Sequence, residues 1–459
     1  MLLTEYRLDL VIHAMRLVLP LEHPADSTLR YFFQQERIGS NERALVAETM
    51  FGVLRHRLFL EYACTLNNPA HESFTRESST RESATQQSTA GATPRRVVLA
   101  YWTKFSGYNL REITPLLKRD EADWLKQVKG INIADLPLSI QAELPQWVID
   151  HLREGSASIA GEISDEAILE LGRSMQQPAA LDIRVNTHLA NRDEVLQIML
   201  VEGMNAQATP YSPIGIRLKD KPSLTRHPLF LSGKIEVQDE GSQLLGFLLA
   251  PKRNDMVVDF CAGSGGKTLM LGALMNSQGR IYAWDTSEKR LANLKPRLKR
   301  SGLSNLHPQL IAHENDSKVK RLAGKIDRVL IDSPCSGLGT LRRNPDIKFR
   351  QSPQSVDELT HKQAAIMAAG AKLLKPGGRL VYATCSFLPQ ENQAIVDAFL
   401  AQHSDFILRP VADILAQQKI LLEAGAYLQL TPQQHNTDGF FAAVLERKKV
   451  PEPQTVIAQ

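Results

Sequence analysis

The chain has 459 residues, of which 43% are apolar and 23% charged, and its formal net charge is +4. That length suits two or three domains with separate cores, and the mild basicity permits nucleic-acid binding without requiring it. No apolar run reaches the ~20 residues of a membrane span. The apolar N-terminus is interrupted by charged residues, Glu5, Arg7 and Asp9, which argues against a secretion signal. The four cysteines are scattered and form no CxxC pair, which argues against a disulfide framework or a zinc site. We therefore expect a cytoplasmic protein with neither a membrane nor a metal partner.

Residues 1–136 are predicted to form a small helical domain. Its clearest helical spacing is carried by five apolar residues: Val46, Met50, Val53, Leu54 and Leu58. Residues 67–93 interrupt the pattern with few apolar residues and many Ser, Thr, Glu and Gln, and Thr75–Ser78 recurs as Thr80–Ser83. That composition predicts a disordered insertion, to which we assign no chemistry.

Residues 137–236 are predicted to form a small α+β accessory domain. One helix carries Ile140, Leu144, Trp147, Val148 and Leu152, and further helices are expected over 166–175 and 192–201. Strands are expected at three places: 180–186, 215–218 and 233–237.

Residues 237–448 alternate strand and helix patterns. Strands are predicted near 256–260, 280–284, 308–312, 326–332 and 378–383, followed by two closing strands at 427–430 and 440–444. Short loops and buried apolar runs predict an α/β fold, with a parallel sheet covered by helices on both faces. The polar tail, 449–459, is expected to be loose.

The segment Val257–Thr268 joins the first of these strands to a helix through three glycines. Its end resembles a P-loop, but the first glycine of that motif is replaced by Cys261, and a dinucleotide fingerprint fails at Thr268. A third pattern is an acid followed by glycines at the fourth and sixth positions, as in Asp259, Gly263 and Gly265. That pattern is typical of class I S-adenosylmethionine (SAM) methyltransferases, although a tight turn without a ligand is the alternative.

The second strand of this region ends in Asp285. An acid about 20 residues beyond the glycines suits ribose hydroxyls, which a carboxylate can accept together. Asp285 could also serve only as the N-cap of the next helix.

Two cysteines follow two further strands where these end: Cys335 in Asp332–Gly339, and Cys385 in Thr384–Ser386. Ligands of such sheets bind at this edge. A thiolate that adds to carbon 6 of a pyrimidine makes carbon 5 nucleophilic enough to take a methyl group, and a base must then remove the carbon 5 proton. The alternative is two small buried hydrophobic residues, and chemistry alone does not decide which thiol attacks.

Together these motifs resemble the RsmB/Nop/Sun family of SAM-dependent RNA cytosine-5 methyltransferases, from about residue 180 to 447. The matching segments are Gln238–Gln243, Cys261–Thr268, Asp332–Gly337, Arg343–Asp346, Thr384–Ser386 and Asp438–Ala442. The N-terminal helices, with Phe51–Arg55, resemble more weakly the NusB-like RNA-binding domain of the bacterial ribosomal RNA member. The resemblance implies a class I (Rossmann-like) methyltransferase sheet, preceded by an RNA-binding α+β domain and an all-α NusB-like domain.

The resemblance also implies roles for residues. Cys385 would be the nucleophile, Cys335 would assist proton removal and release, and Asp332 would hold the cytosine edge next to SAM. SAM would be bound by Cys261, Ala262, Gly263, Ser264, Gly265, Gly266, Lys267, Asp285, Asp316 and Asp332. Within that set Asp285 would bind the ribose, Asp316 the adenine end, and Lys267 would lie between cofactor and substrate.

Phosphate contacts are expected from three cations that follow the Pro-Cys segment: Arg342, Arg343 and Lys348. A longer basic run is interpreted as a solvated helix face: Lys289, Arg290, Lys295, Arg297, Lys299 and Arg300. Ser264 and Ser333 stand where the family usually has Pro and Ala, and because both are small we expect function to survive.

We therefore predict a monomeric RNA (cytosine-5) methyltransferase, with small-subunit ribosomal RNA as the substrate that the resemblance implies. Methylation of another RNA, such as tRNA, would keep the chemistry and change the substrate. A non-catalytic ribosome assembly factor should have lost part of the glycine loop or a cysteine. A DNA cytosine-5 enzyme would be expected to attack from Cys335 instead.

Overall fold

The computed structural model describes residues 2–66, 92–159 and 161–449. Most of the predicted insertion at 67–93 and of the loose tail at 449–459 therefore lies outside the described residues. Within the described ranges, no helix is long and apolar enough to cross a membrane. The chain divides into two compact units: unit 1 with Met1–Glu154, Glu162–Pro178 and Leu341–Ser352, and unit 2 with Gly155–Gly161, Ala179–Thr340 and Pro353–Gln459.

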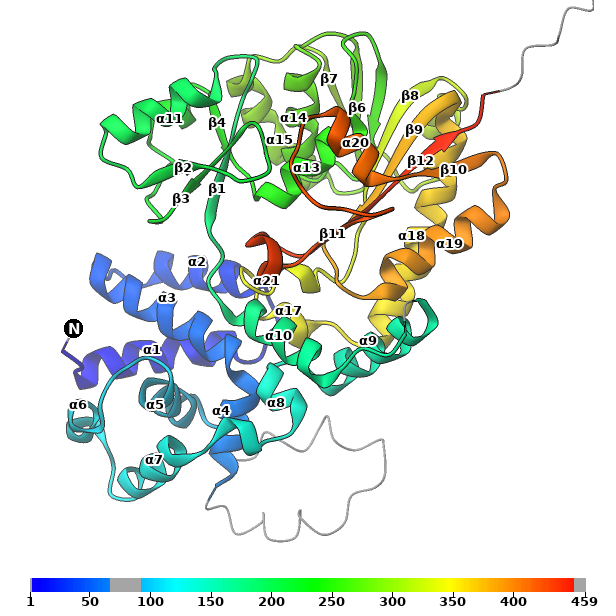
Figure 1. The fold of residues 1–459 in the computed structure, drawn as a ribbon. Coiled ribbons are helices and arrows are strands. Elements are labelled where there is room, and N and C mark those ends of the chain that lie inside the picture. The colour runs from blue at the N-terminus through cyan, green and yellow to red at the C-terminus, as the bar shows by residue number, and fades with distance from the viewer. Residues whose placement is uncertain (1, 67–91, 160, 450–459) are drawn as a thin grey trace, which may run out of the picture. The chain divides into compact units, whose positions relative to one another are not determined.

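Unit 1 is helical (Figure 1). Its elements are α1 (Glu5–Val18), α2 (Ala25–Gln35), α3 (Ser40–Arg55), α4 (Arg57–Thr65), α5 (Pro94–Lys104), α6 (Leu110–Ile113), η2 (Thr114–Leu116), α7 (Glu121–Gly130), η3 (Ile133–Asp135), α8 (Leu138–Ala142), the first part of α9 (Gln146–Ile159), α10 (Asp165–Gln176) and α17 (Ile347–Arg350). The predicted apolar stripe of α3 is buried from Val46 to Leu54. It stops there because α3 ends at Arg55, so that Leu58 belongs to α4 and is only half-buried.

The single helix predicted through Ile140 and Leu152 is two helices. Glu143 adopts a left-handed conformation with φ +53°, so α8 ends before it, and α9 begins after Pro145. The Glu143 carboxylate accepts hydrogen bonds from the backbone N–H groups of Leu58 and Phe59 at 3.1 and 2.9 Å, at the start of α4. Helix α8 therefore belongs to the helical unit, and the expected domain boundary at 136/137 is not where the compact units divide.

Unit 1 also includes a segment from the middle of the region 237–448, Leu341–Ser352. Asp346 Oδ2 accepts from the backbone N–H of Ala25 at 3.1 Å, at the first residue of α2. Arg55 Nη2 donates to the carbonyl of Arg342 at 3.1 Å. The helical unit is thus built from discontinuous parts of the chain, which sequence patterning gave no reason to expect.

Unit 2 begins with a small antiparallel sheet in the order β2-β3-β1-β4. Its elements are β1 (Leu181–Val185), α11 (Arg192–Val201), β2 (Ala206–Ala208), β3 (Gly215–Leu218), α12 (Pro228–Leu231) and β4 (Ile235–Val237). The three predicted strands and the helix at 192–201 are confirmed, whereas β2 was not predicted. Ile183, Ile216 and Ile235 from three of the strands are fully buried in one core.

The second sheet of unit 2 has the order β10-β12-β9-β8-β5-β6-β7, with β11 paired to β12. Its elements are α13 (Glu240–Leu249), β5 (Met256–Asp259), α14 (Gly266–Leu274), β6 (Arg280–Asp285), α15 (Glu288–Ser301), β7 (Leu306–Leu310), α16 (Ser317–Lys320), β8 (Ile326–Asp332), η4 (Leu338–Thr340), α18 (Pro353–Leu373), β9 (Leu374–Thr384), η5 (Pro389–Glu391), α19 (Gln393–Gln402), β10 (Phe406–Arg409), α20 (Val411–Gln417), β11 (Leu428–Leu430), α21 (Pro432–His435) and β12 (Phe440–Arg447).

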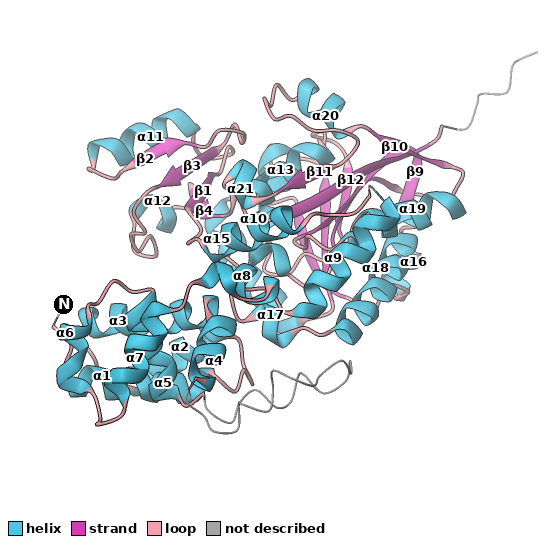
Figure 2. Ribbon diagram, turned by 60° about the horizontal axis from the view of Figure 1, so that its bottom comes forward, coloured by secondary structure: helices cyan, strands magenta, loops and turns pink. Residues whose placement is uncertain are grey.

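Five strands of this sheet, β9-β8-β5-β6-β7, are parallel as predicted. The C-terminal strands β10, β11 and β12 are antiparallel to their neighbours, and sequence patterning did not give the direction of these closing strands. Neighbouring residues of one strand are buried on opposite faces: Val257 lies in a core with helices α13 and α14, and Val258 in a core with α18 and α19. Figure 2 shows the strands between these helices.

Candidate active site

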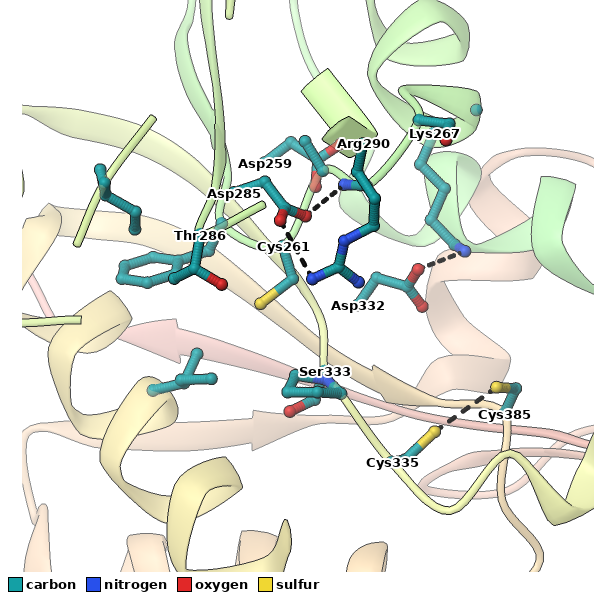
Figure 3. Close-up of a pocket in the computed structure, with 18 of the residues that line it drawn as sticks. Asp259, Cys261, Lys267, Asp285, Thr286, Arg290, Asp332, Ser333, Cys335 and Cys385 are labelled. Carbon is teal, nitrogen blue, oxygen red and sulfur yellow. Dashed lines mark hydrogen bonds and ion pairs between the residues drawn. The ribbon is translucent and has the colours of Figure 1, made fainter. Parts of the chain in front are cut away.

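The C-terminal ends of β5, β6, β8 and β9 border one cavity of about 580 Å³ (Figure 3). Among the predicted site residues, the following line it: Asp259, Cys261, Ala262, Gly263, Ser264, Gly266, Lys267, Asp285, Asp332, Cys335 and Cys385. The strand ends of a doubly wound sheet meet at one edge, which is why residues more than a hundred positions apart come together here.

The glycine loop after β5 depends on two left-handed residues, Gly263 with φ +56° and Gly265 with φ +81°. A Cβ at Gly265 would approach Leu294 Cδ1 to 2.1 Å, so this glycine permits close packing and does not line the cavity. A Cβ at Gly263 would meet nothing within 4 Å. The Gly263 backbone is therefore open to a ligand in the cavity.

Asp285, at the end of β6, holds the glycine loop in position through a hydrogen bond. Its Oδ2 accepts from the Gly263 N–H at 2.8 Å, and its Oδ1 accepts from the Ser287 N–H at 2.7 Å and from Arg290 Nη2 at 3.1 Å. The N-cap of α15 is Ser287, so Asp285 is not the N-cap residue of the following helix. Its oxygens retain lone pairs for hydroxyl donors.

Asp259 supplies a test of whether SAM fits the cavity. Thr268 Oγ1 donates to its Oδ2 at 2.6 Å, but Oδ1 is buried and has no hydrogen-bond partner among the described residues. Burial raises the pKa of Asp259 to about 7. A buried carboxylate oxygen without a partner is costly, and a ligand with a cationic amino group, such as SAM, would satisfy it.

Lys267 and Asp332 form an ion pair inside the cavity, with Nζ 2.7 Å from Oδ2. In Figure 3 the two side chains point toward each other. Burial by itself lowers the pKa of Lys267, but the charge of Asp332 and the hydrogen bond to it outweigh burial and raise that pKa above its ordinary value. The ammonium also lies 5.8 Å from the ring centre of Phe440. Lys267 is therefore a fixed positive charge that faces the ligand space.

The two predicted catalytic thiols lie side by side, with Cys335 Sγ 3.4 Å from Cys385 Sγ. The hydrogen bond to Cys385 and burial raise the pKa of Cys335 well above its ordinary value. The two sulfur atoms are within hydrogen-bond distance, and either thiol can be the donor. A third thiol of the cavity, Cys261, is also kept neutral, because burial raises its pKa.

One buried network holds both cysteine loops. Glu391, which is fully buried, accepts from the Ser336 N–H at 2.7 Å and from Ser336 Oγ at 2.5 Å. Ser336 Oγ lies 3.1 Å from Ser386 Oγ, and Asn392 Nδ2 donates to the Ser386 carbonyl at 2.9 Å. Ser336 follows Cys335 and Ser386 follows Cys385, so Glu391 and Asn392 fix the positions of both thiols.

Some predicted site residues lie elsewhere. Asp316 does not line the cavity: it is the N-cap of α16 and accepts from the backbone N–H groups of Ala312 and Lys318, both at 2.9 Å. Arg342, Arg343 and Lys348 belong to unit 1. Arg342 and Lys348 are buried there, with 4% and 3% of their surface exposed, and Lys348 Nζ donates to the carbonyls of Arg55 and Glu143. These positions do not support phosphate contacts by Arg342 and Lys348.

Sequence reasoning missed several residues of the cavity: Gln238, Thr286, Arg290, His313, Glu314, Lys362 and Ile366. Gln238 opened one of the quoted motifs but received no role. His313 and Glu314 stand just before Asp316 in the same segment, and they line the cavity whereas Asp316 does not. Lys362 and Ile366 come from α18, and nothing in their sequence context distinguishes them from an ordinary helix face.

Family models, relatives of known name and a solved structure match this chain. The family model of 16S rRNA methyltransferase RsmB/F matches residues 246–446, and that of an RsmF/B-like ferredoxin-like domain matches 144–225. The chain is 34% identical over 326 residues to the probable ribosomal RNA small subunit methyltransferase B of Synechocystis, covering 70% of this chain and 71% of that protein. It is 35% identical over 316 residues to ribosomal RNA small subunit methyltransferase B of Shewanella oneidensis, covering 67% and 69%. The solved structure of PH0851 has the same fold, with a TM-score of 0.74 at 24% identity, over 97% of this chain and 99% of that one.

Proposed function

The chain belongs to the RsmB/F family of ribosomal RNA methyltransferases, and we propose that it methylates carbon 5 of a cytosine in small-subunit ribosomal RNA through a covalent Cys385 adduct. The observation that supports this chemistry is the pair of thiols 3.4 Å apart, in the same cavity as the glycine loop and the Lys267–Asp332 ion pair.

The methyl donor is SAM, which supplies an electrophilic methyl group when bound. The backbone of Gly263 and the carboxylates of Asp259 and Asp285 are the groups proposed to hold it. Asp259 Oδ1 would accept from its amino group and Asp285 from its ribose hydroxyls. Ala312, His313 and Glu314 line the cavity after β7, beyond Asp285, and are proposed to border the adenine.

Cys385 is proposed to act first. Its sulfur lies 3.4 Å from the sulfur of Cys335, and the Lys267 ammonium is close enough to interact with it electrostatically. The thiolate adds to carbon 6, which makes carbon 5 nucleophilic. Asp332, held by Lys267, is proposed to bind the amino edge of the cytosine and keep carbon 5 toward the methyl donor.

Release requires loss of the carbon 5 proton. Once Cys385 Sγ is bonded to carbon 6, it no longer shares a hydrogen bond with Cys335. The Cys335 thiol is then proposed to pass its own proton to water, and the resulting thiolate takes the carbon 5 proton. Loss of the proton breaks the bond between carbon 6 and Cys385 Sγ and returns the electron pair to that sulfur. The network through Ser336 and Ser386 would keep Cys335 within reach during both steps.

The test is transfer of a labelled methyl group from SAM to total RNA of a strain that lacks this protein. Wild-type protein should label one ribosomal RNA, and Cys385→Ala should label none. Cys335→Ser should accumulate a covalent RNA adduct visible on a denaturing gel, because release is blocked. Cys261→Ser is the matched control for the covalent step, since its thiol lines the same cavity but is assigned to SAM binding and not to the adduct.

Three outcomes would change the proposal. A Cys385→Ala protein with normal transfer would overturn the nucleophile assignment. An adduct trapped by Cys385→Ser and not by Cys335→Ser would reverse the roles of the two thiols. Label in transfer RNA alone would keep the chemistry and replace the substrate.

A further inference from the structure

A second hollow of about 380 Å³ lies between the small sheet and α15 in unit 2, and we call it the side groove. Its apolar wall is formed by five residues: Leu181, Pro222, Leu224, Phe230 and Val237. Val237 and Arg297 line both the side groove and the catalytic cavity. The two spaces are therefore neighbours that share part of their walls.

The polar end of the side groove carries excess positive charge. Glu236 is its carboxylate, and both Arg297 and Arg300 pair with it, at 3.0 and 2.6 Å. Arg184, which is buried behind this pair, adds a third positive charge that interacts with Glu236. One carboxylate thus faces three guanidinium groups.

Arg300 has unused hydrogen-bonding capacity. Its Nε–H is buried without a partner among the described residues, and its guanidinium lies 4.2 Å from the ring centre of Phe230. Only 18% of the Arg300 side chain and 22% of the Arg297 side chain is exposed. The prediction that this basic run is a solvated helix face was therefore wrong for both residues, because they turn toward the small sheet.

We propose that the side groove binds the nucleotide next to the target cytosine in a single-stranded RNA. This inference rests on the proposed function, since an RNA whose target base enters the catalytic cavity must continue past its rim. A base has an apolar face that suits the wall of Phe230, Leu224 and Val237. Its phosphate is an anion that suits the excess positive charge of the three arginines around Glu236.

The charge and the shape together favour RNA over other occupants. A peptide partner would use the apolar wall but leave the excess positive charge of the arginines without an anion, unless it were acidic. Arg297 also donates to the Ser264 carbonyl at 2.6 Å, so it contacts the glycine loop after β5 as well as the side groove. Arg297 is for that reason unsuitable as a test of RNA binding alone.

The test uses a negative charge placed in the side groove. Thr225 is exposed and lines it, so Thr225→Glu should repel a phosphate without disturbing a core. Leu231→Glu is the matched control, because Leu231 is 61% exposed, lies in the neighbouring helix α12 and does not line the side groove. The measurement is the fluorescence anisotropy of a short labelled single-stranded RNA of mixed sequence, with SAM affinity measured in parallel.

Thr225→Glu should weaken RNA binding by about tenfold or more, which corresponds to loss of one stacked base or phosphate contact, while Leu231→Glu and both SAM affinities stay unchanged. Arg300→Gln should also lower the slope of log affinity against log salt by about one phosphate contact. Equal RNA affinity of Thr225→Glu and wild type would overturn the side-groove proposal. Groove-dependent RNA binding without any methyl transfer would support the proposal and overturn only the proposed reaction. An acidic peptide that displaces wild-type binding more strongly than RNA does would also overturn it.

Discussion

Two lysine–carboxylate pairs of this protein have the same chemistry and opposite uses. Lys267 and Asp332 are 2.7 Å apart in the catalytic cavity, with 13% and 30% of their side chains exposed. Lys348 and Glu143 are 3.4 Å apart in the helical unit, with 3% of each exposed. The pKa of Lys267 is raised, because Asp332 outweighs burial, whereas burial lowers the pKa of Lys348 despite its partner.

The difference lies in what else each pair touches. Lys267 faces a cavity, so its charge is available to a ligand. Lys348 donates to the carbonyls of Arg55 and Glu143, and Glu143 accepts from two backbone N–H groups of α4, so this pair joins Leu341–Ser352 to the helices. Both lysines were predicted to be functional from sequence, and only their surroundings distinguish a charge that faces a cavity from one that joins parts of the chain.

Replacing the lysine by methionine in each pair tests this contrast directly. Lys267→Met should lower the rate of methyl transfer by about 100- to 1,000-fold, as removal of one preorganised charge in an active site does. Its melting temperature should change less than that of Lys348→Met, because Asp332 is 30% exposed and can be solvated when it is unpaired. Single-turnover transfer and thermal denaturation measure the two effects. A large loss of stability with an unchanged rate of methyl transfer would mean that Lys267, like Lys348, has a structural role.

Lys348→Met should have the opposite profile. Removing Lys348 leaves Glu143 in a buried site without its partner, and loss of one member of a buried pair costs about 3–5 kcal/mol of unfolding free energy. The turnover number of the folded protein should stay unchanged, measured at low temperature where the variant is folded. If instead Lys348→Met reduced the salt dependence of RNA binding and left stability unchanged, the result would support the sequence-based prediction that Lys348 contacts a phosphate.

The pH dependence of stability separates the pairs further. Burial raises the pKa of Glu143 from its ordinary value of 4.5 to about 7, so the folded state holds this proton more tightly than the unfolded state. The resulting stabilisation is full below pH 4.5 and is lost as the pH rises through 7. Relative to Glu143→Gln, wild type should therefore lose up to about 3 kcal/mol over this window. Denaturant titrations at pH 4.5 and 7.5 measure it, and an unchanged difference would mean that Glu143 is ionised throughout.

Glu391 is a buried carboxylate that differs from Asp332 and Glu143 because no lysine among the described residues pairs with it. It accepts hydrogen bonds from neutral donors instead: Ser336 and Gln363. Glu391→Gln replaces one acceptor oxygen by a donor that faces Ser336, so the Cys335 loop should shift. We expect the turnover number to fall about tenfold, the cost of one lost hydrogen bond to a charged group, with KM for SAM unchanged. Gln390→Glu is a control in the same turn, and an equal loss there would point to general disruption of η5.

The sequence was sufficient for the parts of the site that sit where strands end. Asp259, Asp285, Asp332 and both cysteines were predicted because a parallel sheet brings its strand ends to one edge. The small sheet was also predictable, except for β2, whose three residues are too few to show alternation.

The remaining features depend on contacts between residues far apart in the sequence. Leu341–Ser352 packs in the helical unit through Asp346 and Lys348, and no local pattern distinguishes a buried lysine from one that binds phosphate. Arg300 looked like part of a solvated run because helical spacing cannot show that Glu236 of another domain lies opposite. Glu391 stands in a short polar turn, whose burial only the tertiary structure reveals.

The smallest expected effect concerns Asp316, predicted to bind the adenine end of SAM. Its carboxylate is engaged by the backbone N–H groups of Ala312 and Lys318, and these hydrogen bonds lower its pKa. Asp316→Asn keeps one acceptor oxygen, so it should weaken SAM binding by no more than about threefold, the effect of one partly lost capping hydrogen bond. Glu314→Gln, in the cavity wall, should weaken it more if this carboxylate contacts the adenine amino group. Calorimetric titration with SAM measures both affinities. A loss of SAM affinity beyond tenfold in Asp316→Asn alone would support the original prediction that Asp316 binds the adenine, and would require the loop to move when SAM binds.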